Sequence, residues 1–310
     1  DRDDPEADAV LEADYPPDAQ RALGHEVVEL FGMRPGSWRL DPTVHPFASS
    51  ASVDDIRITT RYESGLESLF STMHEYGHGL YEHQVDPALD GTLLARGVSL
   101  GLHESQSRMW ENLVGRSRPF WRFFYPRAQA TFPSALGSVD FETFYRAANR
   151  VRRSLIRVRA DEATYNLHVI LRFELEQDII NGDVDLRELP AAWNERMYDY
   201  LGVEVPRDSE GVLQDMHWGS GLIGYFSTYA LGNVISAQIW ERIVAEIPEL
   251  DEQFEQGNFA PLREWLGERL HRHGRKYTPA ETLERIVGGP IDPEPYLRYL
   301  NEKHGAHAPA

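Results

Sequence analysis

"LESLFSTMHEYGHGLYEHQ", residues 66–84, decides how this sequence is interpreted. Apolar residues recur at helical spacing in its first half, so the stretch predicts a helix. Within a helix, His74 and His78 project from one face, and Glu75 is turned about 100° away from His74. This H-E-x-x-H pattern is typical of a helix that holds a catalytic metal together with a general base. An amphipathic helix with surface histidines is the alternative.

A catalytic zinc site needs a third protein ligand and a position left for water. The chain has no cysteine, so histidine, aspartate or glutamate must complete the site. Glu104 is our candidate, because a glutamate on a second helix is typical of the gluzincin class of zinc peptidases. Glu82, His83 and His103 compete with it. His83 is rotated roughly 140° from the ligand face, which favours a surface or supporting role, and His103 is a candidate for a supporting residue.

Such a metal suits peptide hydrolysis, because it polarises a carbonyl group and lowers the pKa of water. Glu75 would accept the water proton and later pass it to the leaving amine. The negative charge that develops needs hydrogen-bond donors. The stretch "GVLQDMHWGSGLIGYFSTY", residues 211–229, offers His217 and Tyr225. A packed aromatic helix is the alternative for that stretch.

Six arginines lie between residues 146 and 159 of an otherwise acidic chain. If the helix that we expect from about Phe141 to Ile180 is continuous here, four of them share one face. These four are Arg146, Arg150, Arg153 and Arg157. The face is either solvated and paired with carboxylates, or it contains an arginine that binds the terminal carboxylate of a peptide through two parallel hydrogen bonds.

Helical periodicity extends over most of the remaining chain, and residues 36–62 are the main exception. Prolines and serines there are followed by alternating Ile56, Ile58 and Thr60, which predicts a loop and a short β element near residues 54–62. Further helices are expected over 92–115, 185–201, 219–246, 260–272 and 279–287, with a frayed tail after residue 300. We therefore predict an all-α fold with a small β insertion, and one region over residues 1–310.

Composition limits the possible partners and compartment. The formal net charge is -19, and the resulting repulsion argues against binding to nucleic acid or to an anionic membrane. Lysine occurs only at Lys276 and Lys303, and an acidic, lysine-poor surface suggests a salt-adapted, halophilic source. Residues 221–240 lack charges, but their polar side chains favour a buried helix over a membrane span. The start of the chain has no features of a signal peptide, so we expect a cytoplasmic protein.

Assembled in order, these residues resemble the carboxypeptidase Taq family of zinc metallocarboxypeptidases from about His45 to the C-terminal region. Separate short motifs carry the resemblance. They are "HPF" at 45–47, "DIRIT" at 55–59, "HEYGH" at 74–78, "HESQS" at 103–107, "IRVRAD" at 156–161, "ILRFELE" at 170–176, "GVLQDMHW" at 211–218 and "GYFSTYALGN" at 224–233.

The resemblance implies a helical fold related to neurolysin and angiotensin-converting enzyme, usually in a homodimer. It makes His74, His78 and Glu104 the ligands of one divalent ion, zinc or alternatively cobalt, and Glu75 the general base. The implied reaction is hydrolysis of the last peptide bond of peptides with a free C-terminal carboxylate. Single amino acids would be released with broad specificity.

The same resemblance implies roles for residues later in the chain. Arg157 and Gln214 are expected near the C-terminus of the substrate. His217 and Tyr225 are expected to donate hydrogen bonds in the transition state, and Tyr229 is the alternative to Tyr225.

One departure from the family leaves two other functions open. Full members have a substantial helical portion before the "HPF" motif, and only about forty residues precede it here. We therefore expect residues 1–310 to form the helical catalytic region without that N-terminal portion. The alternatives are a non-catalytic or weakly active fragment that binds metal or dimerises, and a zinc peptidase with endopeptidase or dipeptidyl activity.

Overall fold

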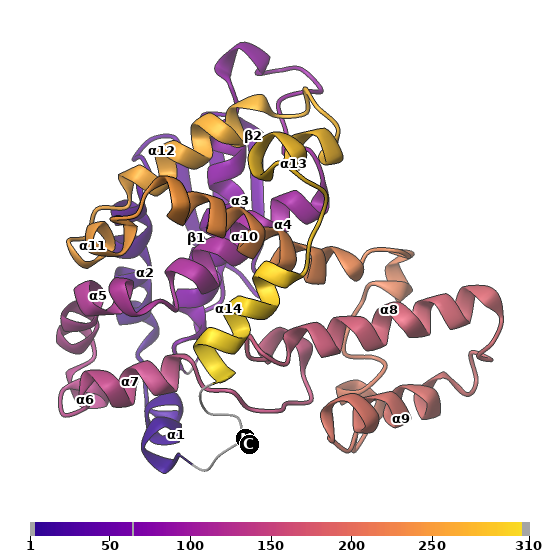
Figure 1. The fold of residues 1–310 in the computed structure, drawn as a ribbon. Helices are drawn as coiled ribbons and strands as arrows, with labels where there is room; N and C mark the ends of the chain where they lie inside the picture. Colours follow the sequence, from indigo (N-terminus) through magenta and orange to yellow (C-terminus); the bar gives the residue numbers. More distant parts are fainter. Residues whose placement is uncertain (1–3, 64, 306–310) are drawn as a thin grey trace. The chain divides into compact units, whose positions relative to one another are not determined.

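The computed structural model describes residues 4–63 and 65–305, and the chain divides into two compact units. The sheet unit comprises Asp4–Ala148 and Gly232–Lys303. The hairpin unit comprises Asn149–Leu231 and residues 304–305. Helices dominate both units, and Figure 1 traces them along the chain.

Two runs of helices build most of the sheet unit. In the sequence, the residues of the hairpin unit lie between these two runs. The first run contains α1 (Pro5–Glu12), α2 (Pro17–Phe31), α3 (Glu67–His83), the 3-10 turn η1 (Pro87–Leu89), α4 (Leu100–Arg108), the π-helical turn η2 (Met109–Val114), α5 (Arg118–Thr131), α6 (Pro133–Leu136) and α7 (Phe141–Ala148). The second run contains α10 (Ser227–Glu246), whose first residues belong to the hairpin unit, α11 (Leu250–Glu255), α12 (Ala260–Arg269), the 3-10 turn η6 (His271–His273), α13 (Pro279–Val287) and α14 (Glu294–His304).

A three-stranded sheet lies between α2 and α3 in the sequence. Its strands are β1 (Trp38–Pro42), β2 (Ala48–Ser52) and β3 (Asp55–Thr60), in the order β1-β3-β2. β1 pairs with β3 in parallel, with Trp38 opposite Ile56, and β2 pairs with β3 antiparallel. Ile56 and Ile58 are fully buried while Arg57 between them is exposed, which is the alternation of a strand with one covered face.

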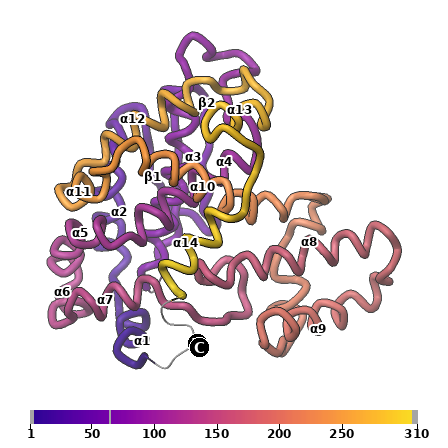
Figure 2. Tube along the Cα trace, in the orientation of Figure 1, coloured from indigo at the N-terminus to yellow at the C-terminus, as the bar shows by residue number. Residues whose placement is uncertain are grey.

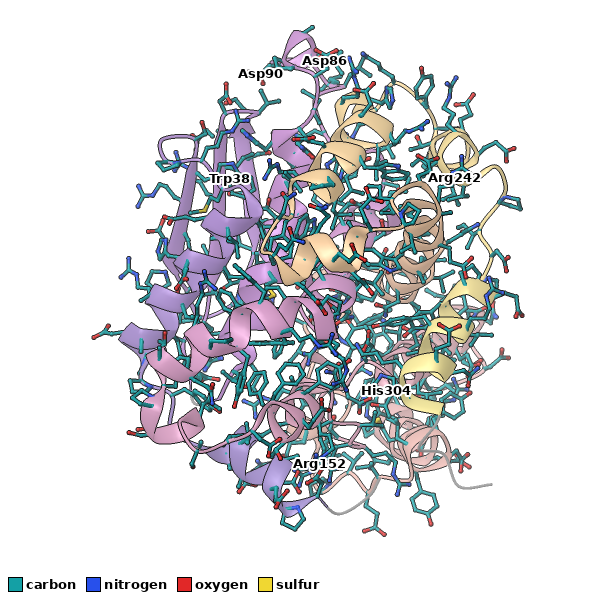
Figure 3. The ribbon with its side chains drawn as sticks, turned by 60° about the vertical axis from the view of Figure 1, so that its left-hand side comes forward. Trp38, Asp86, Asp90, Arg152, Arg242 and His304 are labelled. Atoms are coloured by element: carbon teal, nitrogen blue, oxygen red, sulfur yellow. The ribbon has the colours of Figure 1, made fainter. Side chains whose placement is uncertain are left out.

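α3 is at the centre of the sheet unit and packs against α2, β2, β3 and α4. Tyr76 of α3 is fully buried, stacks on Trp38 with 5.5 Å between ring centroids, and donates a hydrogen bond to the Phe31 carbonyl at 2.7 Å. Figure 3 shows Trp38 beside the strands, and Asp86 and Asp90 on the loop that projects beyond the end of α3. These contacts fix the helix that carries the H-E-x-x-H pattern.

The hairpin unit is built on two neighbouring helices, α8 (Tyr165–Asn181) and α9 (Leu189–Leu201), which lie side by side in Figures 1 and 2. Gly182 ends α8 in the left-handed conformation, at a φ of 81°, as a glycine after the last helical turn commonly does. Short 3-10 turns fill the connections: η3 (Arg157–Arg159), η4 (Asp208–Glu210) and η5 (Trp218–Ser220). Leu171, Leu175, Trp193, Met197 and Leu201 form its small core.

The predicted all-α fold with a small β insertion is confirmed, although the insertion is larger than predicted, since β1 and β2 precede the predicted segment. Residues 279–287 form the expected helix, and α9, α12 and α10 occupy most of their predicted ranges. Within the described part of the chain, the helices fall short of the combination of length and apolarity that a membrane span requires. The prediction of one region over residues 1–310 stays a prediction.

Two local predictions were wrong, and a third was wrong over the part of it that the structure describes. No helix joins α7 to α8, because residues 149–156 are irregular, so the four arginines do not share one helical face. The helix expected over 92–115 begins only at Leu100, where Ser99 caps it by accepting a hydrogen bond from the Leu102 amide at 3.2 Å. The tail is helical as far as His304; residues 306–310 lie outside the described residues.

Candidate metal centre

Three of the predicted site residues meet at one point in the sheet unit. His74 and His78 of α3 both turn their Nε2 atoms toward Glu104 of α4, at 3.7 Å and 3.3 Å from its Oε2 atom. All three possible ligand atoms lie within 4.8 Å of one another. Glu104 is buried, and both histidines are partly exposed. The helical spacing therefore brings the two imidazoles together as the sequence predicted, and α4 supplies the carboxylate.

Two glycines allow the helices to approach this closely. A Cβ atom at Gly77, between the two histidines in sequence, would overlap the backbone carbonyl of Gln106 on α4. A Cβ atom at Gly232 of α10 would overlap the side chain of Glu104. Figure 2 shows α3 and α4 as neighbouring segments. Glycine at these positions lets Glu104 reach the histidines and lets α10 cover it from another side.

Polar side chains support two of the possible ligands. Glu111, in the π-helical turn that continues α4, bonds to Nδ1 of His74 at 2.8 Å. Arg108 lies between the two carboxylates and donates to Glu104 at 2.9 Å and to Glu111 at 3.1 Å. Ser107 donates a hydrogen bond of 3.1 Å to Oε2 of Glu104. A histidine that ligates a metal commonly forms a hydrogen bond through its other nitrogen, as His74 does with Glu111. This bond fixes the ring and its tautomer.

His78 is supported by one of the residues that competed for the role of ligand. Its Nδ1 atom lies 2.6 Å from Nδ1 of His103, and Nε2 of His103 lies 2.9 Å from Oε1 of Glu82. Another competitor, His83, turns its Nδ1 atom to the Val53 carbonyl at 2.6 Å. Glu82, His83 and His103 thus all lie outside the cluster of possible ligand atoms.

Burial and charge oppose each other at the histidines and at Glu104. Burial lowers the pKa of His78 to about 4, which keeps its imidazole neutral. Burial also acts to lower the pKa of His74, but Glu104 and Glu111 outweigh it and raise that pKa. The pKa of Glu104 is strongly lowered, because His74, Arg108 and His78 together overcome the effect of burial. Glu104 is therefore an ionised carboxylate, the form that binds metal.

Glu75 is the next residue on α3 after His74, and only 6% of it is exposed. Burial raises its pKa to about 7. A carboxylate with a pKa near neutral pH is suited to accepting and returning a proton. A cation held at the neighbouring ligand atoms would act against this shift, because positive charge stabilises the ionised form.

The donor set fits a divalent metal of the zinc type. Two imidazole nitrogens and one carboxylate oxygen are a usual ligand set for catalytic zinc, and they leave a fourth position for water or substrate. The carboxylate is charged and His78 is neutral, as ligation requires. His74, His78 and Glu104 would therefore hold such an ion.

The other predicted site residues belong to the hairpin unit. Arg157 is 5% exposed, and its Nε and Nη2 atoms donate to Oδ1 of Asp215 at 3.1 Å and 2.7 Å. Its Nη1 atom donates to the Tyr165 hydroxyl at 3.0 Å. The Gln214 side chain accepts from the Arg157 amide at 2.9 Å and donates to the Leu155 and Glu210 carbonyls. Gln214 therefore fixes the loop on which Arg157 lies.

His217 bonds through Nε2 to the Tyr229 hydroxyl at 3.0 Å, and its ring centroid lies 5.4 Å from that of Tyr225. Both tyrosines therefore adjoin His217, and the choice between them as donor stays a prediction. The hairpin unit groups His217 with these tyrosines, as the spacing within 211–229 suggested.

Sequence analysis missed several residues of these networks, including Arg108, Glu111 and Asp215. Asp215 accepts from Arg157 through Oδ1 and from the fully buried Arg172 through Oδ2, at 2.7 Å, so it joins two buried cations. Glu111 follows Glu104 by two helical turns, and that periodicity could have indicated it. No spacing in the sequence relates Asp215 to Arg172, because their contact depends on the loop after α9.

Comparison with known proteins gives a consistent result. A model of the family described as "Carboxypeptidase Taq (M32) metallopeptidase" matches residues 1–304. "Thermostable carboxypeptidase 1" of Thermus thermophilus is 45% identical over 301 residues, which are 96% of this chain and 59% of that protein. "Carboxypeptidase 1" of Bacillus subtilis is 39% identical over 292 residues, covering 94% of this chain and 58% of its own length.

Solved structures agree with these matches. The crystal structure of an M32 carboxypeptidase from Deinococcus radiodurans superimposes with a TM-score of 0.93 at 45% identity, covering 97% of this chain and 63% of that one. The chain thus spans 59% and 58% of the length of the two curated relatives. Because the family match extends over residues 1–304, the chain belongs to the carboxypeptidase Taq (M32) metallopeptidase family.

Proposed function

We propose that this chain is the catalytic part of a zinc-dependent metallocarboxypeptidase that releases single amino acids from peptide C-termini with broad specificity. The observation that carries the proposal is the cluster of His74, His78 and Glu104, with the buried Glu75 beside it on the same helix. Membership of a metallopeptidase family whose curated relatives are named carboxypeptidases supports it.

In this proposal His74, His78 and Glu104 hold the ion and Glu75 is the general base. Zinc, when bound, supplies Lewis acidity toward the peptide carbonyl and lowers the pKa of water. Glu75 accepts a proton from that water and passes it to the nitrogen of the leaving amino acid. Its burial beside the possible ligands suits both steps, because the same carboxylate must take up the proton and later release it.

The proposal assigns substrate contacts to residues of the hairpin unit. Arg157 would bind the terminal carboxylate, and its guanidinium plane is fixed in advance by Asp215 and Tyr165. Gln214 would act on the same end of the substrate through the loop that it holds. His217 and Tyr225 would donate hydrogen bonds to the negative charge that develops on the carbonyl oxygen.

Several general properties belong to the same proposal. The partners are peptides with a free C-terminal carboxylate, rather than nucleic acid or membrane, which the net charge of -19 supports through repulsion. The protein is a cytoplasmic homodimer, and its acidic, lysine-poor surface belongs to a salt-adapted protein. Zinc is the proposed metal, with cobalt as the substitute.

The test compares the zinc-loaded chain on one peptide in two forms, with a free C-terminal carboxylate and with a C-terminal amide. We expect release of single amino acids from the free-acid form and very slow cleavage of the amide. Equal cleavage of the last bond in both forms would contradict carboxylate recognition, and internal cleavage would favour an endopeptidase. Bound zinc without hydrolysis of either form would favour a metal-binding fragment.

A further inference from the structure

A series of hydrogen-bonded side chains lies behind His78 and runs from α3 through α4 and back to α3. It consists of His78, His103 and Glu82, joined by contacts of 2.6 Å and 2.9 Å. His74, by contrast, is supported directly by a carboxylate, Glu111. The structure therefore gives the two histidines different supports, and the support of His78 contains an extra imidazole.

The contact between the two Nδ1 atoms restricts where the protons lie. At 2.6 Å, one of these nitrogens must carry a proton and the other must accept it. If Nε2 of His78 binds a metal, that nitrogen has no proton, so Nδ1 of His78 must be the donor. Nδ1 of His103 is then the bare acceptor, and the single proton of the neutral His103 ring lies on Nε2, which faces Glu82.

Glu82 is arranged to accept that proton in a hydrogen bond. Its Oε1 atom accepts from Nε2 of His103 and from the Gly97 amide, both at 2.9 Å. Its Oε2 atom accepts from the Ser50 hydroxyl at 3.2 Å and from Arg96 at 3.4 Å. All of these partners donate hydrogen bonds to the carboxylate. A glutamine side chain at residue 82 would therefore place its N–H group against another donor.

Packing holds the imidazole ring of His103, the middle residue of this series, in place. The Tyr81 ring, which is fully buried, lies 5.4 Å from the His103 ring. A Cβ atom at Gly97 would lie 2.5 Å from Cδ2 of His103, so the loop before α4 closes on the ring only because residue 97 is glycine. His103 is thus fixed by an acidic partner, an aromatic ring and a loop, and it contacts His78 through Nδ1 rather than through the Nε2 atom that faces Glu104.

We infer that His103 and Glu82 are positioning residues that hold His78 in the tautomer with its proton on Nδ1 and its Nε2 atom available to the metal. The inference rests on the proposed ligand set. It assigns to His103 and Glu82 a role in metal affinity, and to His103 the tautomer with its proton on Nε2. The outer partners of metal-bound histidines typically change metal affinity about 10- to 100-fold.

The first experiment measures the affinity of the full chain for Zn²⁺ by competition with a chromogenic chelator. We expect His103→Leu to weaken Zn²⁺ binding about 10- to 100-fold, and Glu82→Gln to weaken it as well. His103→Asn should lose less affinity, because its side-chain oxygen can still accept the proton of His78. His83→Leu is the matched control, since His83 is also a partly buried histidine but bonds to a backbone carbonyl; its affinity should equal that of wild type.

A second experiment needs no substitution. Ring ¹⁵N NMR of the Zn²⁺-loaded wild type should show His103 protonated on Nε2 and bare on Nδ1, and His78 protonated on Nδ1. His103 protonated on Nδ1 would overturn the inference. Thermal unfolding of each variant separates lost affinity from lost folding.

The affinities also separate failure of this inference from failure of the proposed function. If His78→Ala loses Zn²⁺ while His103→Leu and Glu82→Gln bind it like wild type, the ligand set stands and the positioning role is wrong. If His78→Ala binds Zn²⁺ as tightly as wild type, the ligand set itself is wrong, and the inference falls with it.

Discussion

Single residues of α3 have separate tasks that substitution can distinguish. His74 and His78 point their Nε2 atoms at Glu104, whereas Glu75 contributes none of the three clustered ligand atoms. Removing a ligand and removing the base should therefore have different effects on metal content. This distinction is the most direct check of the roles proposed within the H-E-x-x-H pattern.

Glu75→Gln keeps the size of the side chain and removes its ability to accept a proton. We expect turnover of a free-acid peptide to fall by about 10²- to 10⁴-fold, the usual contribution of general acid–base catalysis. Zinc content, measured by elemental analysis after dialysis, should stay near one ion per chain. Loss of zinc would instead show that Glu75 supports or ligates the metal.

Arg157→Ala tests both the stability of the hairpin unit and the recognition of a terminal carboxylate. The substitution removes two hydrogen bonds to Asp215, a residue that is itself buried between Arg157 and Arg172, so we expect a loss of about 1–3 kcal/mol in unfolding free energy. In kinetics, kcat/KM should fall much more for a free-acid peptide than for its amide.

Arg152→Ala is the matched control, because Arg152, labelled in Figure 3, is an exposed arginine on the irregular segment that precedes Arg157. Its stability and its kinetics on both peptides should match those of wild type. An equal loss of kcat/KM on the free acid and the amide in Arg157→Ala would remove Arg157 from carboxylate recognition and leave it a structural role.

At the scale of elements, the site depends on the distance between α3 and α4. Gly77 is helical and has no positive φ, so its absence of a side chain serves close packing rather than backbone conformation. A methyl group there would meet the backbone of α4, which has little freedom to move aside. The same helix pair supplies all three possible ligands.

Gly77→Ala should therefore destabilise the protein by about 1–3 kcal/mol, the usual cost of overpacking, and should weaken Zn²⁺ binding by shifting Glu104. Gly24→Ala on α2 is the control, since its Cβ atom would lie at an ordinary 3.5 Å from Thr72. We expect that control to gain about 0.5–1 kcal/mol from helix propensity. Thermal unfolding and chelator competition measure both effects, and equal stability of the two variants would contradict the packing argument.

At the scale of the whole molecule, charge is the dominant property. A formal net charge of -19 on 310 residues opposes compaction through self-repulsion. Many surface carboxylates are paired with arginine, such as Glu241 with Arg298 at 2.8 Å and Glu142 with Arg118. Exposed pairs of this kind contribute little to stability, so they do not offset the repulsion among the excess carboxylates.

Salt should therefore stabilise the protein. Raising NaCl from about 0.1 M to 1 M shortens the screening length from about 10 Å to 3 Å, and Tm should rise by about 2–4 °C for each kcal/mol of repulsion removed. Differential scanning calorimetry in NaCl, with sucrose of equal osmolarity as a control that does not screen charge, measures the effect. A Tm that falls or stays constant in NaCl would contradict salt adaptation.

The sequence by itself determined the predominantly helical class of the fold and the pair of histidines in the candidate metal centre. His74 and His78 share a face because helical geometry fixes the direction of residues four apart, and Ile56 and Ile58 are buried together because strand geometry alternates. Family resemblance and helix order were enough to select Glu104. The histidine pair and the strand alternation depend on neighbours in the chain, where local geometry leaves few alternatives, whereas Glu104 lies on another helix.

Only the tertiary structure decided what surrounds those residues. It placed Gly77 against the backbone of α4 and joined His78 to His103 and Glu82. It also showed that the arginine-rich segment leaves the helical path after α7 and that Asp215 holds Arg157. Each of these contacts joins residues far apart in the chain or on different elements. They follow from the packing of backbones against one another, which the periodicity of a single segment does not specify.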